Sequence, residues 1–236
     1  MPSPGDMPRW SGRLALLVVL GSAAAASAQQ ETRPSGNQPS AYQVDGIALG
    51  SRMRPGGSAY REYKCTPSEQ FDGLTWCQKS SQDRERRGPF TVTYSILRDA
   101  SGSILYVNRY QVPAFFGPNE AKEDIASYAR KFGETPEITD VPRRSGQPHC
   151  QLALWGNVVL KVLDSESMKI VADGKSPKKG MLIDCIGDFT RSVKEGLPLY
   201  RISGSAGFVW VASYDERGRG TLRFAAVDAS RLAPQN

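Results

Sequence analysis

The chain has 236 residues, with 30 lysines and arginines against 24 aspartates and glutamates, which gives a formal net charge of +6 at pH 7. Hydrophobic residues make up 39% of the sequence and aromatic residues 9%, a composition that fits a globular protein with one substantial core or two small ones. The modest net charge and the acids interleaved with the bases argue against dedicated nucleic-acid binding.

The N-terminus has the pattern of a secretory signal peptide. Arg9 and Arg13 supply positive charge, residues 14–20 form an apolar run, and Ala26-Ser27-Ala28 is a small-residue cleavage site. We therefore expect residues 1–28 to be removed after Ala28. The apolar segment is shorter than the roughly 20 residues that span a bilayer, so we expect no membrane anchor and a periplasmic or secreted protein.

The residues that follow divide the chain further. Residues 29–40 are rich in Gln, Ser, Pro and Gly, a composition typical of a flexible linker. We expect a single domain over residues 41–232, with a weak seam near residues 142–148, and a short tail at residues 233–236.

Four cysteines, Cys65, Cys77, Cys150 and Cys185, allow three disulfide pairings in an oxidising compartment. We expect Cys65 to pair with Cys77 and Cys150 with Cys185, because each pair flanks segments that look like neighbouring strands. A zinc site or a thioredoxin-like site would need C-x-x-C spacing or several histidines, and the chain has one histidine. The sequence therefore predicts two disulfides and no metal site.

The first half of the domain predicts a hairpin and a helix. Residues 42–49 suggest a short strand or turn that leads into the first cysteine pair. Apolar and polar residues alternate in "FTVTYSILRDASGSILYV", which predicts a β-hairpin turning at residues 99–102. An apolar stripe at helical spacing then runs from Pro118 to Phe132, with Gly133 after it, and predicts an amphipathic helix.

The second half repeats this mixture. We expect "CQLALWGNVVLKVLD" to form one bent strand or two short strands broken at Gly156, and residues 164–174 to form a short helix with Asp164 as N-cap. A strand in "GMLIDCIGDF", a helical turn in "TRSVKEG" and a hairpin in "GFVWVASYDERGRGTLRFAAVD" follow. The two hairpins have a similar shape and little identity, so an internal duplication stays open.

These elements predict an α+β fold, in which antiparallel β-hairpins pack with two or three short amphipathic helices and are stapled by disulfides.

The sequence offers little support for catalysis. His149 is the only histidine, and its neighbour Cys150 would point to the opposite face of a strand, so the two cannot share a proton easily. No G-x-S-x-G motif is present. We therefore assign no catalytic residue, although acids such as Glu62, Glu69 and Asp72 would suffice for glycan hydrolysis if two of them met.

Basic residues recur in four short stretches of the chain. If the fold gathers these residues on one face, they would bind phosphate or carboxylate polymers. If it does not, they lie in four separate solvated loops. The candidate anion-binding residues are Arg84, Arg86, Arg87, Arg143, Arg144, Lys178, Lys179, Arg217 and Arg219.

Several short stretches are distinctive as a set: "GIALGS", "YKCTPSEQFDGLTWCQ", "YVNR", "KFGETP", "LALWG", "GLPLYR" and "GFVW". Together they resemble uncharacterised exported proteins of alpha-proteobacteria over most of residues 42–230, which implies a periplasmic or secreted setting and no known activity. More distantly, a G-x-x-L-G motif, a cysteine pair, a hairpin and a helix ending in F-G-x-x-P are similar to small accessory lipoproteins of outer-membrane β-barrel assembly. The chain has no lipobox cysteine, so no functional residue is carried over.

The sequence thus predicts a non-enzymatic exported envelope protein that binds an anionic envelope polymer or an envelope protein, without a cofactor. The alternative is a cell-wall glycan hydrolase that uses a carboxylate pair, and it requires an Asp and a Glu to converge in a cleft.

Overall fold

The computed structural model describes residues 41–232 except residues 55, 86–87, 143–144 and 175–179, and it describes the backbone alone in the rest of residues 83–90. The predicted signal peptide, linker and tail lie outside the described residues.

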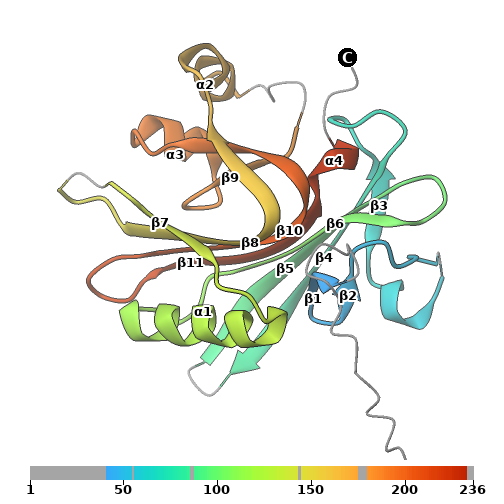
Figure 1. Cartoon of the computed structure of the whole chain (residues 1–236), viewed down its shortest axis with the longest axis horizontal. Coiled ribbons are helices and arrows are strands. Elements are labelled where there is room, and N and C mark those ends of the chain that lie inside the picture. The colour runs from blue at the N-terminus through green and yellow to red at the C-terminus, as the bar shows by residue number, and fades with distance from the viewer. Residues whose placement is uncertain (1–40, 55, 86–87, 143–144, 175–179, 233–236) are drawn as a thin grey trace, which may run out of the picture. The chain divides into compact units, whose positions relative to one another are not determined.

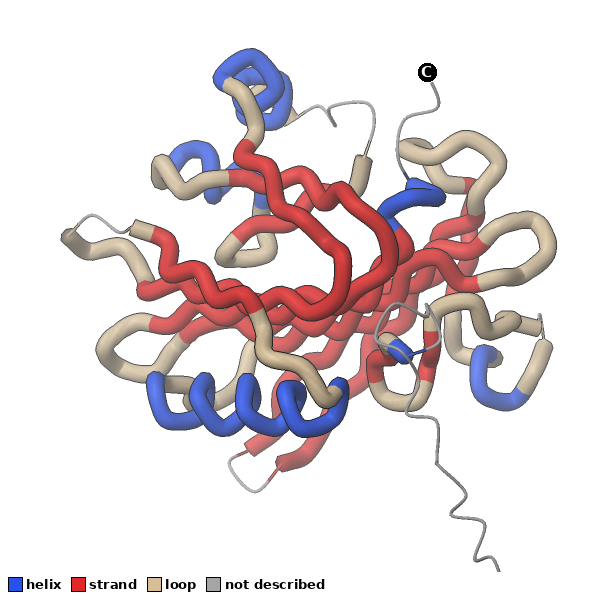
Figure 2. The backbone as a smooth tube through the Cα atoms, in the orientation of Figure 1, coloured by secondary structure: helices blue, strands red, loops and turns tan. Residues whose placement is uncertain are grey.

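One antiparallel sheet of nine strands organises the chain (Figures 1 and 2). Its order is β3-β4-β5-β6-β11-β10-β8-β7, and β9 pairs with the first residues of β10. A separate hairpin is formed by β1 and β2. The strands are β1 (Gln43–Val44), β2 (Ile47–Ala48), β3 (Lys64–Pro67), β4 (Thr75–Glu85), β5 (Gly88–Arg98), β6 (Ile104–Gln111), β7 (Glu137–Val141), β8 (His149–Val162), β9 (Leu182–Asp184), β10 (Leu199–Tyr214) and β11 (Gly220–Asp228).

The sheet consists of two meanders that meet in the middle. Strands β3 to β6 follow one another in both chain and sheet order, and so do β7, β8, β10 and β11. The last strand of each meander, β6 or β11, pairs with the last strand of the other. The two predicted hairpins, β5–β6 and β10–β11, therefore lie side by side at the centre of the sheet.

The strand β8 is one bent strand and not two short ones. Gly156 lies inside it with φ of +80°, and the register with β10 shifts between Gly204 and Gly207. A side chain at Gly156 would collide with the ring of Tyr42 and its hydroxyl. Glycine is required here because it alone accepts this conformation and this close approach. Beyond it, β8 and β10 curve together (Figure 2).

Four helices occur in the described part of the chain, and three of them were predicted. The helix α1 begins at Pro118 and is closed by Gly133, whose N–H donates to Ala129 O. Asp164 caps α2 by accepting a 2.7 Å hydrogen bond from Ser167 N. The helices are α1 (Pro118–Phe132), α2 (Ser165–Ala172), α3 (Phe189–Lys194) and α4 (Ala229–Leu232), with a 3₁₀ helix at Ser58–Tyr60.

Apolar side chains bury both faces of the sheet. On one face α1 packs its Tyr128 and Phe132 on a cluster that includes Trp155, Phe208 and Phe224. The other face carries an aliphatic cluster with residues of β8 to β11. Antiparallel strands and short helices are as predicted, but the sheet dominates the structure more than an α+β class suggests.

Both predicted disulfides are present. Cys65 and Cys77 face each other across β3 and β4, while Cys150 of β8 joins Cys185, which directly follows β9. Among the residues that the structure describes, no helix is both long and apolar enough to cross a membrane.

Candidate anion-binding site

Three neighbouring strands place Lys79, Tyr94 and Arg109 in a row, which we call the cationic row. Lys79 of β4 is in register with Tyr94 of β5, which is in register with Arg109 of β6, and Arg109 faces Phe224 of β11. Directly opposite residues of antiparallel strands share one face of the sheet. Because Phe224 belongs to the cluster under α1, the cationic row lies on the α1 face.

Aromatic rings surround the cations of this row. Lys79 Nζ lies 5.1 Å from the ring centres of both Tyr63 and Tyr94, and the Arg109 guanidinium lies 5.6 Å from the ring centre of Phe224. Such contacts are worth about 0.5 to 1 kcal/mol each at exposed sites. They hold the two cations in place without neutralising their charge.

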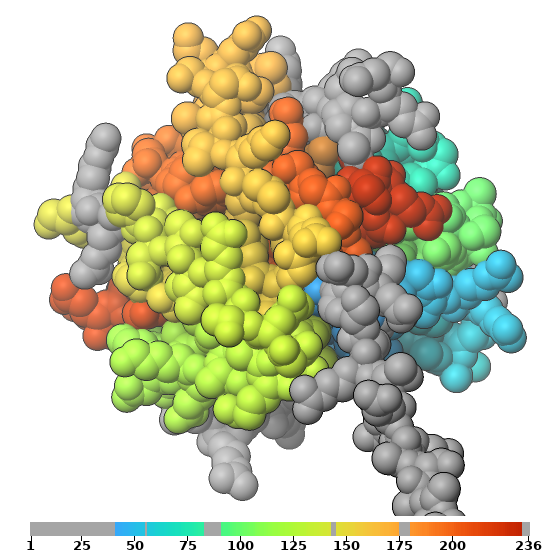
Figure 3. Space-filling view, viewed as in Figure 1, coloured from blue at the N-terminus to red at the C-terminus, as the bar shows by residue number. Residues whose placement is uncertain are grey.

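A third cation comes from the end of α1. Lys131 Nζ lies 5.5 Å from the ring centre of Tyr128, and partial burial lowers the pKa of Lys131 although Asp45 opposes the shift. The helix α1 lies on the face of the molecule that Figure 3 shows, in green, and the hairpin β1–β2 lies beside its C-terminal end (Figure 1). There the rings of Tyr42 and Phe132 pack with 5.3 Å between their centres.

The carboxylate of Asp45, in the turn between β1 and β2, faces the cationic row. Asp45 Oδ2 accepts a 2.6 Å hydrogen bond from Tyr94 Oη and lies 3.5 Å from Arg109 Nη1. Its side chain is 41% exposed, and that of Arg109 is 17% exposed. A second carboxylate, Glu62, lies 3.7 Å from Lys79 Nζ and is mostly exposed. Among the side chains that the structure describes, the three cations Lys79, Arg109 and Lys131 thus outnumber the two carboxylates that contact them.

Two buried polar atoms at the site have no hydrogen-bond partner in the described structure. They are Arg109 Nε and the hydroxyl oxygen of Tyr63. Burial raises the pKa of Tyr63 above its ordinary value, so its hydroxyl, like that of an ordinary tyrosine at neutral pH, is protonated and can donate a hydrogen bond. Unpaired buried donors are uncommon in folded proteins, and a ligand is one way to satisfy them.

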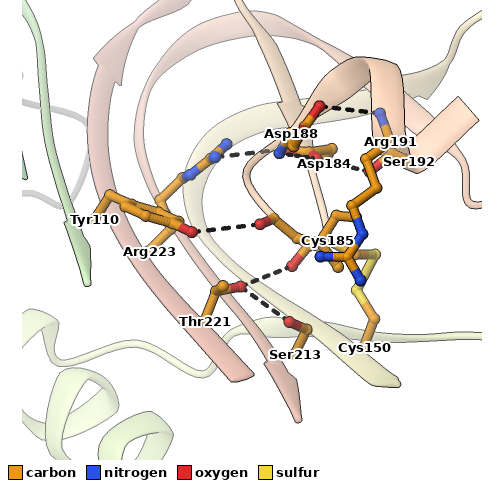
Figure 4. A network of polar contacts seen from close by, with 11 residues as sticks. Tyr110, Cys150, Asp184, Cys185, Asp188, Arg191, Ser192, Ser213, Thr221 and Arg223 are labelled. Carbon is orange, nitrogen blue, oxygen red and sulfur yellow. Dashed lines mark hydrogen bonds and ion pairs between the residues drawn. A yellow bond between two sulfur atoms is a disulfide. The ribbon is translucent and has the colours of Figure 1, made fainter. Parts of the chain in front are cut away.

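A second arginine occupies the equivalent place on the opposite face of the sheet (Figure 4). Arg223 of β11 faces Tyr110 of β6, and its guanidinium lies 5.7 Å from the centre of that ring. Its Nη2 lies 3.3 Å from Oδ1 of Asp184, and Asp184 Oδ2 accepts hydrogen bonds from Ser192 Oγ at 2.7 Å and Asp188 N at 3.0 Å. The Asp184 side chain is 0% exposed and that of Arg223 is 12% exposed, so the carboxylate of this pair has no contact with water.

The segment after Asp184 is fastened to the sheet by further contacts. Cys185 is disulfide-bonded to Cys150, and its carbonyl accepts a hydrogen bond from Thr221 Oγ1 at 3.2 Å (Figure 4). The polar network around Arg223 is therefore structural, whereas the cationic row reaches solvent.

Of the predicted anion-binding residues, only Arg217 and Arg219 have side chains that the structure describes. Arg219 Nη2 lies 2.7 Å from Asp215 Oδ2, so its charge is largely neutralised within its own turn. Arg217 lines a cleft of about 490 Å³ together with Arg219, Ser145 and Gln147. The others, whose side chains lie outside the described residues, are Arg84, Arg86, Arg87, Arg143, Arg144, Lys178 and Lys179.

Sequence reasoning missed the cationic row. Lys79, Tyr94 and Arg109 lie far apart in the chain and form no motif, although "NRY" does place an arginine inside the predicted hairpin. Only the register of β4, β5 and β6 brings them together.

Acidic residues do converge in a different cleft, which has a volume of about 610 Å³ and is lined by Asp140, Asp215 and Glu216 beside His149. His149 Nε2 lies 3.4 Å from Asp140 Oδ1. Backbone and side-chain hydrogen bonds from Arg219 lower the pKa of Asp215. The cleft therefore brings carboxylates together, but hydrogen bonds from Arg219 hold the Asp215 carboxylate within its own turn.

The acids singled out from the sequence do not form this cleft. Glu62 contacts Lys79, whereas Glu69 lines a separate cleft of about 510 Å³ with Phe71 and Trp76. Within the described ranges, no group of three or more His, Cys, Asp or Glu side chains is placed to hold a metal ion.

Comparison with known proteins adds no relative: no family model, curated protein or solved structure matches the chain. The resemblance drawn from short sequence stretches therefore stays a prediction, and the cationic row is the basis for assigning a function.

Proposed function

We propose that the protein is a non-enzymatic exported envelope protein that binds an anionic component of the cell envelope through the cationic row. The observation that carries this proposal is an excess of cations over contacting carboxylates in the described structure, with Lys79 and Arg109 in the row and Lys131 beside it. The formal net charge supports it, because it is still +5 once residues 1–28 with Asp6, Arg9 and Arg13 are removed, and long-range attraction would draw the protein to anionic polymers and lipids. The predicted signal peptide and the two disulfides support export.

The setting of the row favours an oxyanion ligand. Arg109 is mostly buried, and charges attract each other more strongly where water is partly excluded. A guanidinium presents several N–H donors in a planar fork that matches carboxylate and phosphate groups, and Arg109 Nε is unpaired. Binding should therefore weaken with salt, but less than binding to a fully exposed patch.

The test is co-sedimentation of the exported, purified protein with cell-wall sacculi and with phosphatidylglycerol vesicles from low to high salt. The variant Lys79→Gln/Arg109→Gln removes two charges from the row. Lys122→Gln/Arg130→Gln removes two charges from exposed positions of α1 and is the matched control. We expect the row variant to bind at least about tenfold more weakly than the control, a loss of about 1.4 kcal/mol.

Equal losses in the two variants would show that general charge, and not the cationic row, drives association. No binding of the wild-type protein to either material would contradict the proposal and favour a protein partner of the envelope.

The alternative, a glycan hydrolase, is favoured by one observation: Asp140, Asp215 and Glu216 line one cleft. Glycan hydrolysis needs one carboxylic acid that stays protonated, and Asp215 is unsuited because its pKa is lowered. Soluble fragments released from sacculi by the wild type, but not by Asp140→Asn or Glu216→Gln, would establish the hydrolase and overturn the binding proposal.

A further inference from the structure

We propose that Asp45 occupies the place of the ligand's oxyanion, so that a carboxylate or phosphate group displaces it from Tyr94 and Arg109 on binding. This inference rests on the proposed function, because it concerns how the same cationic row is occupied when no ligand is bound.

Donors from two strands converge on a single oxygen atom of Asp45. Asp45 Oδ2 receives the Tyr94 hydroxyl at 2.6 Å and lies 3.5 Å from Arg109 Nη1, so donors from β5 and β6 converge on it. Converging donors of this kind form a site for any oxyanion, whichever chain carries it. The contact with Arg109 is long, and Arg109 Nε has no hydrogen-bond partner. Asp45 brings one oxygen atom to Arg109, whereas a ligand carboxylate or phosphate that is free to orient could bring two to the guanidinium fork.

The turn that holds Asp45 does not depend on the Asp45 carboxylate. Val44 pairs with Ile47, and the two residues between them, Asp45 and Gly46, have φ of +47° and +81°. Asp-Gly is a preferred sequence for two-residue hairpin turns in which both central residues have positive φ. Val44 is buried at 1% exposure, whereas Asp45 and Gly46 are exposed. The Asp45 side chain can therefore leave the row while the hairpin stays anchored.

Asp45 differs from Asp184, which makes the corresponding ion pair with Arg223. Asp184 has two further hydrogen-bond donors, from Ser192 and Asp188, and its side chain is fully buried. Asp45 reaches water, and ion pairs that reach water are worth only about 0 to 1 kcal/mol. Replacing the aspartate carboxylate by a ligand group therefore costs little free energy at Asp45 and much more at Asp184.

Asp45 then acts as a built-in competitor of the ligand. Removing its charge while keeping the turn should strengthen oxyanion binding by about fivefold. A water-exposed ion pair contributes at most about 1 kcal/mol, and that free energy corresponds to about a fivefold change in affinity. The charge is removed by Asp45→Asn. Asp72→Asn removes a carboxylate at another exposed position and changes the net charge equally, so it is the matched control.

The experiment titrates wild type and variants with three probes: inorganic phosphate, short oligogalacturonates and phosphatidylglycerol vesicles. We expect Asp45→Asn to bind at least one probe about fivefold more tightly, Asp72→Asn to bind like the wild type, and Tyr94→Phe to bind more weakly because it lacks the hydroxyl donor. The probe that gains affinity identifies the source of the oxyanion as free phosphate, a carboxylated glycan or a lipid headgroup.

Equal affinities of Asp45→Asn and Asp72→Asn for every probe would overturn the competitor role and leave the proposed function standing. No binding of any probe by any variant would overturn both. If Asp45→Asn melts at a lower temperature than the control, Asp45→Gly replaces it, since glycine suits the positive φ at this position, and the same gain in affinity is expected.

Discussion

Two arginines at the centre of the sheet have the same local setting and different surroundings. Arg109-Tyr110 on β6 lies against Arg223-Phe224 on β11, and each arginine stacks over the aromatic ring of the opposite strand. Each also pairs with one aspartate, but the side chain of Asp184 is 0% exposed and that of Asp45 is 41% exposed.

The comparison teaches that burial, and not the pairing itself, separates a structural ion pair from an exchangeable one. On the face that carries Arg223, Asp184 is held by further hydrogen bonds. On the α1 face, Asp45 can be exchanged for a ligand.

The largest expected effect comes from breaking the buried pair. Arg223→Met leaves Asp184 charged and unpaired in the interior, which should cost about 3 to 5 kcal/mol of the free energy of unfolding. Arg109→Met leaves Asp45 in contact with water and should cost about 1 kcal/mol or less. Urea unfolding of the two variants measures both values. Equal losses would contradict the distinction between a buried structural ion pair at Arg223 and an exposed one at Arg109.

The two disulfides give the next comparison. Cys150 and Cys185 are separated by 35 residues and fasten the segment around Asp184, whereas Cys65 and Cys77 are separated by 12 residues. The loop-entropy model assigns about 4 kcal/mol to the longer loop and about 3 kcal/mol to the shorter one. Replacing each pair by alanine and measuring urea unfolding tests this order. A larger loss on removing the Cys65–Cys77 bond would show that loop length does not decide how much each disulfide contributes to the free energy of unfolding.

The smallest expected effect concerns the turns of the two central hairpins, which are built alike. Asp99 and Asp215 each begin a turn in which a glycine three residues later donates its N–H to the aspartate carbonyl at 3.0 Å. The carboxylate of Asp99 also pairs with Arg231 of α4 at 2.6 Å, whereas that of Asp215 pairs with Arg219 of its own turn.

This difference predicts a dependence on pH. Burial raises the pKa of Asp99, but hydrogen bonds from Ser101, Arg231 and Ser103 outweigh it and bring the pKa to about 2. An aspartate of an unfolded chain titrates near about 3.9, so the contribution of Asp99 to stability is complete above that pH and is lost as the pH falls towards about 2. Asp99→Asn should cost about 1 kcal/mol at pH 7 and less at pH 3.

Melting temperatures at pH 7 and pH 3 check this prediction, with Asp215→Asn as the control. We expect a smaller loss for Asp215→Asn, because its side chain is 31% exposed against 18% for Asp99, and the ion pair described for it is with Arg219 of its own hairpin. A cost for Asp99→Asn that does not change with pH would contradict the assigned role of the Asp99 carboxylate.

Some of the fold followed from local patterns. The helix α1 was predictable because its apolar stripe, Pro118 and Gly133 all act within one segment, and α2 because Asp164 is a good N-cap. Both disulfide pairings were predicted from the strands that flank them, and the structure confirms them. The strand β7 (Glu137–Val141) was missed because four of its five residues are exposed and no apolar alternation marks it.

The sequence by itself determined the helices α1 and α2, the helical turn at α3 and the two central hairpins, since capping, turn chemistry and periodicity act over a few residues. For the cysteines it only favoured one of three pairings, which the structure confirms. It did not determine the pairing of β6 with β11, or the register that aligns Lys79, Tyr94 and Arg109 and brings Asp45 against them. Those relations depend on long-range packing of the two meanders under α1. The basic residues that were conspicuous in the sequence are neighbours in the chain, whereas the cationic row consists of neighbours in space.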